Sequence, residues 1–230
     1  MATPVSLAVF FAVPHEAALL KKKLKFRWQK KGVGLFFAET RVRDKTILFA
    51  CLGMGKEAVK KNLTFLLDYF TFSQAILAGY AGALDPKLEK GDIVISDKRY
   101  LDLLPDLKLG KIISVDTVAA TAEEKYALFQ KTGASVCDME YEAALVICQK
   151  HNLTLYSIRA VSDTAHENLP SGALASAFDL KRQRSTPLKI FCYGIRHPRN
   201  MISFFKFVHG LAKSQRALTQ ILIQILKNQS

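Results

Sequence analysis

Acidic side chains stand at three points where an apolar run of residues ends or a predicted helix begins. These acids are Glu16, the alternating Asp138, Glu140 and Glu142, and Asp163. Ligand sites in open α/β sheets collect beyond the ends of strands, and two positioned carboxyl groups can serve as general acid and general base. Structural roles compete with this interpretation, because acids also stabilise helix N-termini and because Arg159 could form a structural ion pair with Asp163. The acids are the first candidates for chemistry.

Glycines follow two of the same apolar runs, within residues 51–56 and 78–84. A glycine lets the backbone come close to a ligand, but it also serves in ordinary turns. Neither segment matches the GxGxxG pattern of dinucleotide sites or the phosphate-binding loop of nucleotide hydrolases. The sequence therefore gives little support for a dinucleotide or triphosphate ligand.

Alternating strands and helices must position these residues. Short apolar runs rich in β-branched and aromatic residues predict strands at residues 7–13, 35–38, 46–51, 74–78, 92–96, 111–114 and 155–160. Helical spacing of apolar residues predicts helices at residues 15–25, 56–70, 122–131 and 138–150. Strands that alternate with helices indicate an α/β fold.

The bulk composition is that of a single soluble domain. Half of the 230 residues are hydrophobic, which suffices for a sizeable core, and no apolar run is long enough to span a membrane. The apolar residues 5–13 lead directly to His15 and Glu16, which is unlike a secretory leader. We therefore expect a cytoplasmic protein.

The cysteines predict neither a disulfide framework nor a metal site. They are Cys51, Cys137, Cys148 and Cys192. They lie far apart, without a CxxC pair or the Cys/His spacing that holds zinc. We expect buried free thiols and no bound metal.

The net charge of +13 is concentrated near the C-terminus. Residues 181–230 contain ten Lys or Arg and no Asp or Glu, so only +3 remains for residues 1–180. One interpretation is a non-catalytic, basic module that binds nucleic acid, with an affinity that falls steeply with salt. No basic and aromatic recognition motif accompanies the charge, so we expect no nucleic-acid partner.

The basic C-terminal segment has the pattern of an amphipathic helix. A polar stripe recurs every seven residues, at Arg199, Lys206, Lys213, Gln220 and Lys227. An apolar stripe has the same period, at Phe204, Leu211, Leu218 and Ile225. The stripes are offset by about 200° on a helix, so they lie on opposite faces. Such a helix either covers the core of the protein or rests on anionic lipid at the inner face of the membrane.

Taken in order, six segments resemble the purine nucleoside phosphorylase and nucleosidase superfamily, and within it the methylthioadenosine/S-adenosylhomocysteine nucleosidases. They are residues 12–16 (AVPHE), 53–56 (GMGK), 79–84 (GYAGAL), 91–96 (GDIVIS), 138–140 (DME) and 159–163 (RAVSD). The resemblance implies a three-layer α/β/α sandwich around a mixed sheet, and a homodimer. We expect this domain at residues 1–180, with residues 181–230 as a basic helical extension packed on it.

The resemblance also implies roles for individual residues in cleaving the N-glycosidic bond of a purine nucleoside. Glu16 would activate the attacking water, Asp163 would protonate purine N7, and Glu140 would bind the ribose hydroxyls. This division suits an oxocarbenium-like transition state, since the base leaves easily only when protonated. The resemblance implies further contacts: Met139 would pack under the ribose, Val118 and Ser162 would bind the purine, and Met54, Gly79 and Tyr80 would line the pocket. It implies no cofactor.

Two departures from the phosphorylases bear on the nucleophile. Phosphorylases of this superfamily carry a phosphate-binding Arg two residues before the glycine that matches Gly79, and a Ser or Thr after it. This sequence has Leu77 and Tyr80 instead. Hydrolysis by water is therefore favoured, with phosphorolysis as the alternative. Asp138, where the nucleosidases have Glu, leaves open which adenine nucleoside is the substrate.

After Asp163 the sequence leaves the nucleosidase pattern and looks more like the hopanoid-associated phosphorylases. This second resemblance rests on residues 119–125 and 132–134, before Asp163, and on residues 196–198 in the basic tail. This resemblance implies phosphorolysis of a lipid-linked adenosine such as adenosylhopane as the alternative reaction. It also gives a reason for the C-terminal helix to contact an anionic membrane.

Overall fold

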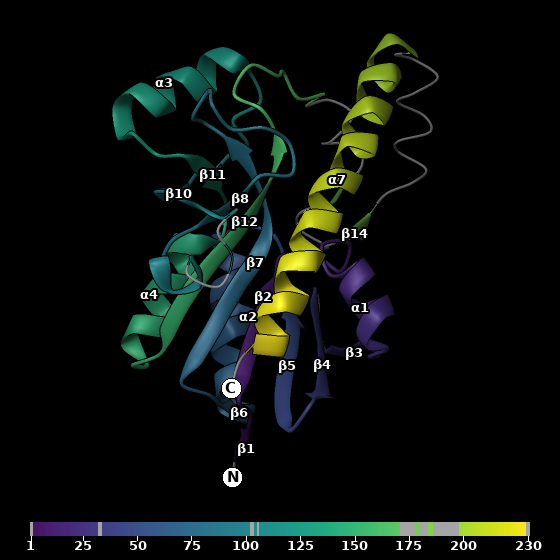
Figure 1. Cartoon of the computed structure of the whole chain (residues 1–230), viewed down its shortest axis with the longest axis vertical. Helices are drawn as coiled ribbons and strands as arrows, with labels where there is room; N and C mark the ends of the chain where they lie inside the picture. Colours follow the sequence, from purple (N-terminus) through teal and green to yellow (C-terminus); the bar gives the residue numbers. More distant parts are fainter. Residues whose placement is uncertain are drawn as a thin grey trace.

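A mixed β-sheet forms the centre of the molecule (Figure 1). The computed structural model describes residues 2–31, 34–101, 104, 106–170, 178–179, 184–185 and 198–228. Of these, residues 178–206 are described by their backbone alone. Along the main path of the sheet the strands are β3 (Gln29–Lys31), β4 (Leu35–Val42), β5 (Lys45–Cys51), β2 (Leu7–Phe11), β7 (Gln74–Ala83), β12 (Thr154–Asp163), β8 (Ile93–Ile95) and β9 (Lys108–Leu109). Strands β5, β2, β7 and β12 are parallel to one another. Strand β4 runs antiparallel to β3 and β5, and β8 runs antiparallel to β12 but parallel to β9.

Shorter strands extend this arrangement. Strand β11 (Val136–Asp138) pairs with the end of β7 and with β10 (Ile112–Ser114). Two small sheets lie apart from the central one: β1 (Thr3–Pro4) with β6 (Phe70–Thr71), and β13 (Phe178–Asp179) with β14 (Arg184–Ser185). A single 3-10 turn, η1 (Lys98–Tyr100), follows β8.

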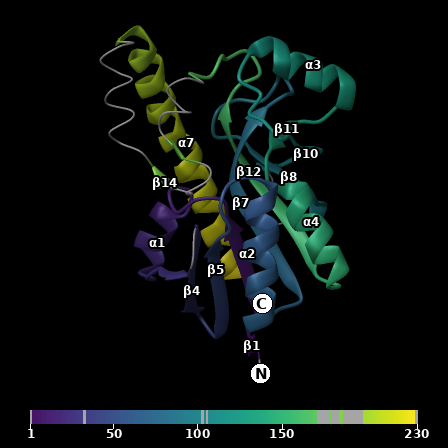
Figure 2. The same ribbon diagram turned by 180° about the vertical axis from the view of Figure 1, so that it is seen from behind.

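Helices cover both faces of the sheet. They are α1 (Ala18–Leu24), α2 (Lys56–Tyr69), α3 (Ala122–Thr132), α4 (Tyr141–Lys150) and α7 (Pro198–Asn228). Helices α1 and α7 cover the face that is nearer in Figure 1, and α2 and α4 cover the face that is nearer in Figure 2. The predicted α/β fold with three layers is confirmed.

Strand β2 shows why both faces are covered. Its five residues are all buried. Leu7 and Val9 join the hydrophobic cluster beneath α1 and α7, whereas Ala8 and Phe10 join the cluster beneath α2 and α4. Successive side chains of a strand point to opposite faces, so a strand that is apolar at every position needs a helical layer on each side.

The C-terminal helix α7 covers the core with its apolar stripe. Leu218, Leu222 and Ile225 are buried in the same cluster as β2. Lys213 and Lys227, from the polar stripe, are exposed. The predicted amphipathic helix is therefore present, and its apolar face packs on the sheet. The predicted domain boundary at residue 180 and the side chains of Arg199, Phe204 and Lys206 lie outside what the structure describes.

Several predicted boundaries were wrong. Helix α4 begins at Tyr141 rather than at residue 138, because Asp138 is the last residue of β11. Only Glu142 of the three alternating acids lies in the first turn of the helix. Helix α1 begins at Ala18 rather than at residue 15, and β7 continues to Ala83 rather than ending at residue 78.

Two further predictions concern the thiols and membrane spans. Cys51, Cys137 and Cys148 are free and buried, as predicted, and Cys192 lies outside the described residues. Among the helices that the structure describes, none combines the length and the apolar character that crossing a membrane requires.

Candidate active site

Glu16 is held in the turn between β2 and α1 by backbone donors. Its Oε2 accepts hydrogen bonds from the N–H of Ala12 (2.7 Å) and of Val13 (3.1 Å), and its Oε1 accepts one from the N–H of Tyr80 (2.9 Å). Burial raises the pKa of Glu16, and the bond from Tyr80 and the charge of Arg159 oppose this rise. A carboxylate that is fixed in this way and has a raised pKa suits a general base.

Arg159 lies at the centre of the buried acids. It sits within β12, its side chain has no exposed surface, and it forms an ion pair with Asp138 at the end of β11. Its charge also acts on Glu16 and Glu140. An unpaired buried charge is very unfavourable, so this single guanidinium allows three carboxyl groups to share one region of the interior. The alternative of a structural ion pair between Arg159 and Asp163 is not borne out, because Arg159 pairs with Asp138 and Asp163 pairs with Lys125.

Glu140 is the N-cap residue of α4 and reaches the loop after β5. Its Oε1 accepts a hydrogen bond from the N–H of Gly55 (2.8 Å). Burial raises the pKa of Glu140 to about 7, with a further rise from the negative charge of Asp138. The side chain is buried beside Met139, which is half-buried. Glu16 also acts on the charge of Glu140, so two of the three predicted acids lie in one electrostatic cluster.

Asp163 ends β12 and has partners on both carboxyl oxygens. The Oγ of Ser162 lies 2.5 Å from Oδ1, and the Nζ of Lys125 lies 2.6 Å from Oδ2. Asp163 and Lys125 are both buried. This buried ion pair was not predicted from the sequence.

The last residues of β7 join Asp163 to the other acids. Gly79 pairs with Arg159 in the sheet, and Gly82 pairs with Asp163 after a bulge in β12. A Cβ at Gly79 would lie 2.6 Å from Oε1 of Glu16, and one at Gly82 would lie 3.2 Å from Oδ2 of Asp163. The two glycines are three residues apart, which is about 10 Å along a strand. Both glycines therefore lie inside a strand rather than in a turn, and they let carboxyl groups approach the backbone.

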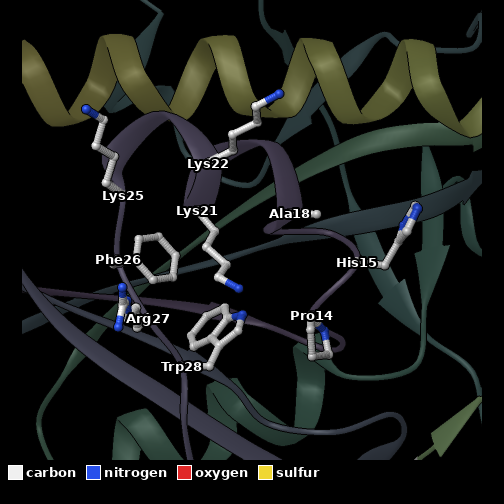
Figure 3. A pocket seen from close by; sticks show the side chains of 9 residues that line it. All are labelled: Pro14, His15, Ala18, Lys21, Lys22, Lys25, Phe26, Arg27 and Trp28. Carbon is white, nitrogen blue, oxygen red and sulfur yellow. The ribbon is translucent and has the colours of Figure 1, made fainter.

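An open pocket of about 660 Å³ adjoins this region at His15, the residue before Glu16 (Figure 3). Its lining includes the aromatic Phe26 and Trp28 and four cations, which are Lys21, Lys22, Lys25 and Arg27. Figure 3 shows Lys21 extending toward the ring of Trp28. The surface beside Glu16 is thus positively charged.

The other predicted pocket residues differ in how near they lie to the acids. Tyr80, which donates its N–H to Glu16, and Met54 are half-buried, whereas Val118 is 50% exposed on the loop between β10 and α3. Ser162 is buried, and its Oγ lies against Asp163 and against the carbonyl of Ala81 (3.1 Å). The structure therefore brings Ser162 to the acids, while the role of Val118 stays a prediction.

Sequence reasoning missed Lys125. It lies between the exposed residues Glu124 and Tyr126 and has the appearance of a solvated position in an amphipathic helix. Its acidic partner follows 38 residues later in the chain, so no local pattern indicates the pair.

Several known proteins are similar to this chain over most of its length. The 5'-methylthioadenosine/S-adenosylhomocysteine nucleosidase of Staphylococcus saprophyticus is 27% identical over 199 residues, which cover 69% of this chain and 86% of that protein. The solved nucleosidase of the same name from S. pneumoniae, with a transition-state inhibitor, has a TM-score of 0.71 at 20% identity and covers 98% of this chain and all of that one. The futalosine hydrolase of Helicobacter pylori has a TM-score of 0.69 at 17% identity, covering 99% of this chain and 98% of that one. These structures share the fold.

A family model described as the phosphorylase superfamily matches residues 6–104 and 100–187. The match includes all three acids on which the candidate site is built. The chain belongs to the phosphorylase superfamily.

Proposed function

We propose that this chain is a purine nucleosidase, which hydrolyses the N-glycosidic bond of an adenine nucleoside and releases the free base. The observation that carries the proposal is the arrangement at the end of β7. Glu16 is fixed at Gly79 and Asp163 lies at Gly82, so the proposed general base and the proposed acid for the departing purine contact backbone positions that are about 10 Å apart along one strand.

The chemistry divides between these groups. Glu16 takes a proton from water as the oxygen attacks the anomeric carbon, and the electron pair of the glycosidic bond passes to the purine. Asp163 assists departure of the base by placing a proton on N7, and Glu140 accepts hydrogen bonds from the ribose hydroxyls. Met139, Val118 and Ser162 complete the ribose and purine contacts in this proposal. General acid–base assistance of this kind contributes roughly 10²–10⁴-fold.

The contacts of Glu16 favour water over phosphate. Its carboxylate accepts the N–H of Tyr80, the donor that follows Gly79, and so takes up a group that an anion would need. Arg159 pairs with Asp138, and Lys56 pairs with Asp116 at 2.7 Å. Phosphorolysis is the second candidate, because the cationic pocket beside His15 offers another place for an anion.

The substrate proposal follows the relatives. Their names specify methylthioadenosine and adenosylhomocysteine, and we propose an adenine nucleoside with water as the only co-substrate. We also propose that the chain forms a homodimer and that α7 contacts anionic lipid. The exposed Lys213 and Lys227 support the contact with lipid.

A panel of nucleosides tests the proposal. Methylthioadenosine, adenosylhomocysteine and adenosine are incubated with the full-length chain, with and without phosphate, and the free base and the sugar product are separated by chromatography. We expect equal adenine release in both conditions, with the free sugar as product. Adenine release that needs phosphate and yields a sugar 1-phosphate would establish phosphorolysis instead.

A further inference from the structure

Lys125 is an ammonium group with no exposed surface. Its Nζ donates hydrogen bonds to the carbonyls of Thr164 (2.8 Å) and Glu167 (2.8 Å), and it lies 2.6 Å from Oδ2 of Asp163. An ammonium has three N–H donors and no acceptor, so these three oxygens account for all of them.

This arrangement directs a positive charge at one carboxyl group. Helix α3 presents its neighbouring residues Glu123, Glu124 and Tyr126 to solvent, whereas Lys125 turns inward to the end of β12. Removing an ammonium from water is expensive unless it is paired and hydrogen-bonded. The two carbonyls belong to Thr164 and Glu167, one and four residues after Asp163, so the bonds that hold Lys125 also fix the segment that follows Asp163.

We propose that Lys125 is a positioning residue for departure of the base. It holds the carboxyl group of Asp163 and supplies, through that carboxyl group, the proton that the leaving purine accepts. This inference rests on the proposed nucleosidase function. The titratable groups near the pair are Cys137, Asp138 and Glu167. Burial raises the pKa of the Cys137 thiol to about 12, and each of the two acids has a cation of its own: Asp138 pairs with Arg159, and Glu167 pairs with Lys90 at 2.7 Å.

The proton balance is as follows. As the bond to the anomeric carbon breaks, its electron pair enters the purine, and Asp163 gives a proton to N7 while it receives one from the Lys125 ammonium. Lys125 is then a neutral amine, and Glu16 holds the proton lost by the attacking water. Exchange with solvent returns one proton to Lys125 and removes one from Glu16, so the net reaction is nucleoside plus water giving base plus sugar.

Ser162 accommodates both states of Asp163. Its Oγ lies 2.5 Å from Oδ1 and 3.1 Å from the carbonyl of Ala81, but a hydroxyl has a single proton to donate. When Asp163 is ionised, Ser162 can donate to Oδ1. When Oδ1 carries a proton, the Oγ of Ser162 can accept a hydrogen bond from it and donate its own proton to the carbonyl of Ala81. The proton can therefore change place without displacement of heavy atoms.

The test separates base departure from folding by changing the leaving group. An ordinary adenine nucleoside needs a proton on the base, whereas 7-methyladenosine carries a cationic base that leaves neutral without one. We compare kcat on both substrates, corrected for spontaneous hydrolysis, for the wild type, Lys125→Met and Lys125→Gln. Gln keeps two N–H donors for the carbonyls of Thr164 and Glu167. Lys90→Met is the matched control, since it removes a cation that pairs with Glu167, on the segment that Lys125 also binds, rather than with Asp163.

We expect both Lys125 variants to lose about 100-fold in kcat on the ordinary nucleoside and to keep kcat on 7-methyladenosine within about threefold. Lys90→Met should match the wild type on both substrates. Equal losses on the two substrates, or no loss on either, would overturn the role of Lys125. A wild type that releases base from neither substrate would instead refute the proposed function.

Discussion

The substitution Gly79→Ala tests whether close packing at β7 holds Glu16 and Arg159 in place. The new Cβ would lie 2.6 Å from Oε1 of Glu16 and 2.7 Å from Nη1 of Arg159, where ordinary contact begins at 3.4 Å. Both side chains must therefore move, Glu16 by about 0.8 Å and Arg159 by about 0.7 Å, and neither is free to do so. Glu16 is held by three backbone donors and Arg159 by its buried ion pair with Asp138.

Two magnitudes follow from this displacement. Inserting a methyl group into a packed interior costs about 1–3 kcal/mol, so we expect the free energy of unfolding to fall by about 2 kcal/mol. Misplacement of a reacting group by about 1 Å can cost about 100-fold in rate. We expect kcat/KM for adenine release from methylthioadenosine to fall by about that factor.

The assay combines urea unfolding with initial rates of adenine release. Gly110→Ala is the matched control, because its Cβ would lie 2.5 Å from Oγ of Ser135, outside the acidic cluster. The control should lose stability but keep kcat/KM per folded molecule. If Gly79→Ala keeps wild-type kcat/KM, or if Gly110→Ala loses as much activity, the reasoning about Glu16 is wrong.

Two other predictions concern Glu140 and α7. The pKa of Glu140 is raised by burial to about 7 from 4.5, so its contribution to wild-type stability is complete below about pH 4.5 and is lost as the pH rises to about 7. As the pH rises over that range, the wild type should therefore lose up to ~3 kcal/mol of unfolding free energy relative to Glu140→Gln. A difference in unfolding free energy that does not change with pH would contradict the raised pKa of Glu140. Leu218→Ala should destabilise the protein by about 2–5 kcal/mol in thermal or urea unfolding, because Leu218 of α7 is fully buried against the sheet, whereas Lys213→Ala should change little. Equal effects would show that α7 does not cover the core in solution.

The apolar pattern predicted the central strands because both faces of the sheet are buried. Their ends depend on contacts that the pattern does not contain. Strand β2 ends at Phe11 rather than at residue 13, since the next two N–H groups donate to Glu16. Strand β7 continues past Gly79 because β12 runs beside it, with Arg159 paired to Gly79 and Asp163 to Gly82 along the backbone. From the sequence alone, glycine is as typical of a turn.

The candidate site was predicted only in part, for a similar reason. Motif order identified Glu16, Glu140 and Asp163. The groups that pair around these acids come from distant parts of the chain: Asp138, the partner of Arg159, ends a strand rather than opening a helix, and Lys125 lies in a segment that has the pattern of a solvated helix. Ion pairs between residues far apart in the chain leave no periodic signal, so only the folded structure reveals them.

The central claim is that Glu16 and Asp163 assist cleavage from the two sides of one glycosidic bond. The most direct measurement is the initial rate of adenine release from methylthioadenosine in phosphate-free buffer, for the wild type, Glu16→Gln and Asp163→Asn. We predict release by the wild type and a loss of about 100-fold or more in each variant, with folding intact by circular dichroism. Wild-type rates in both folded variants, or no release by the wild type, would contradict the account.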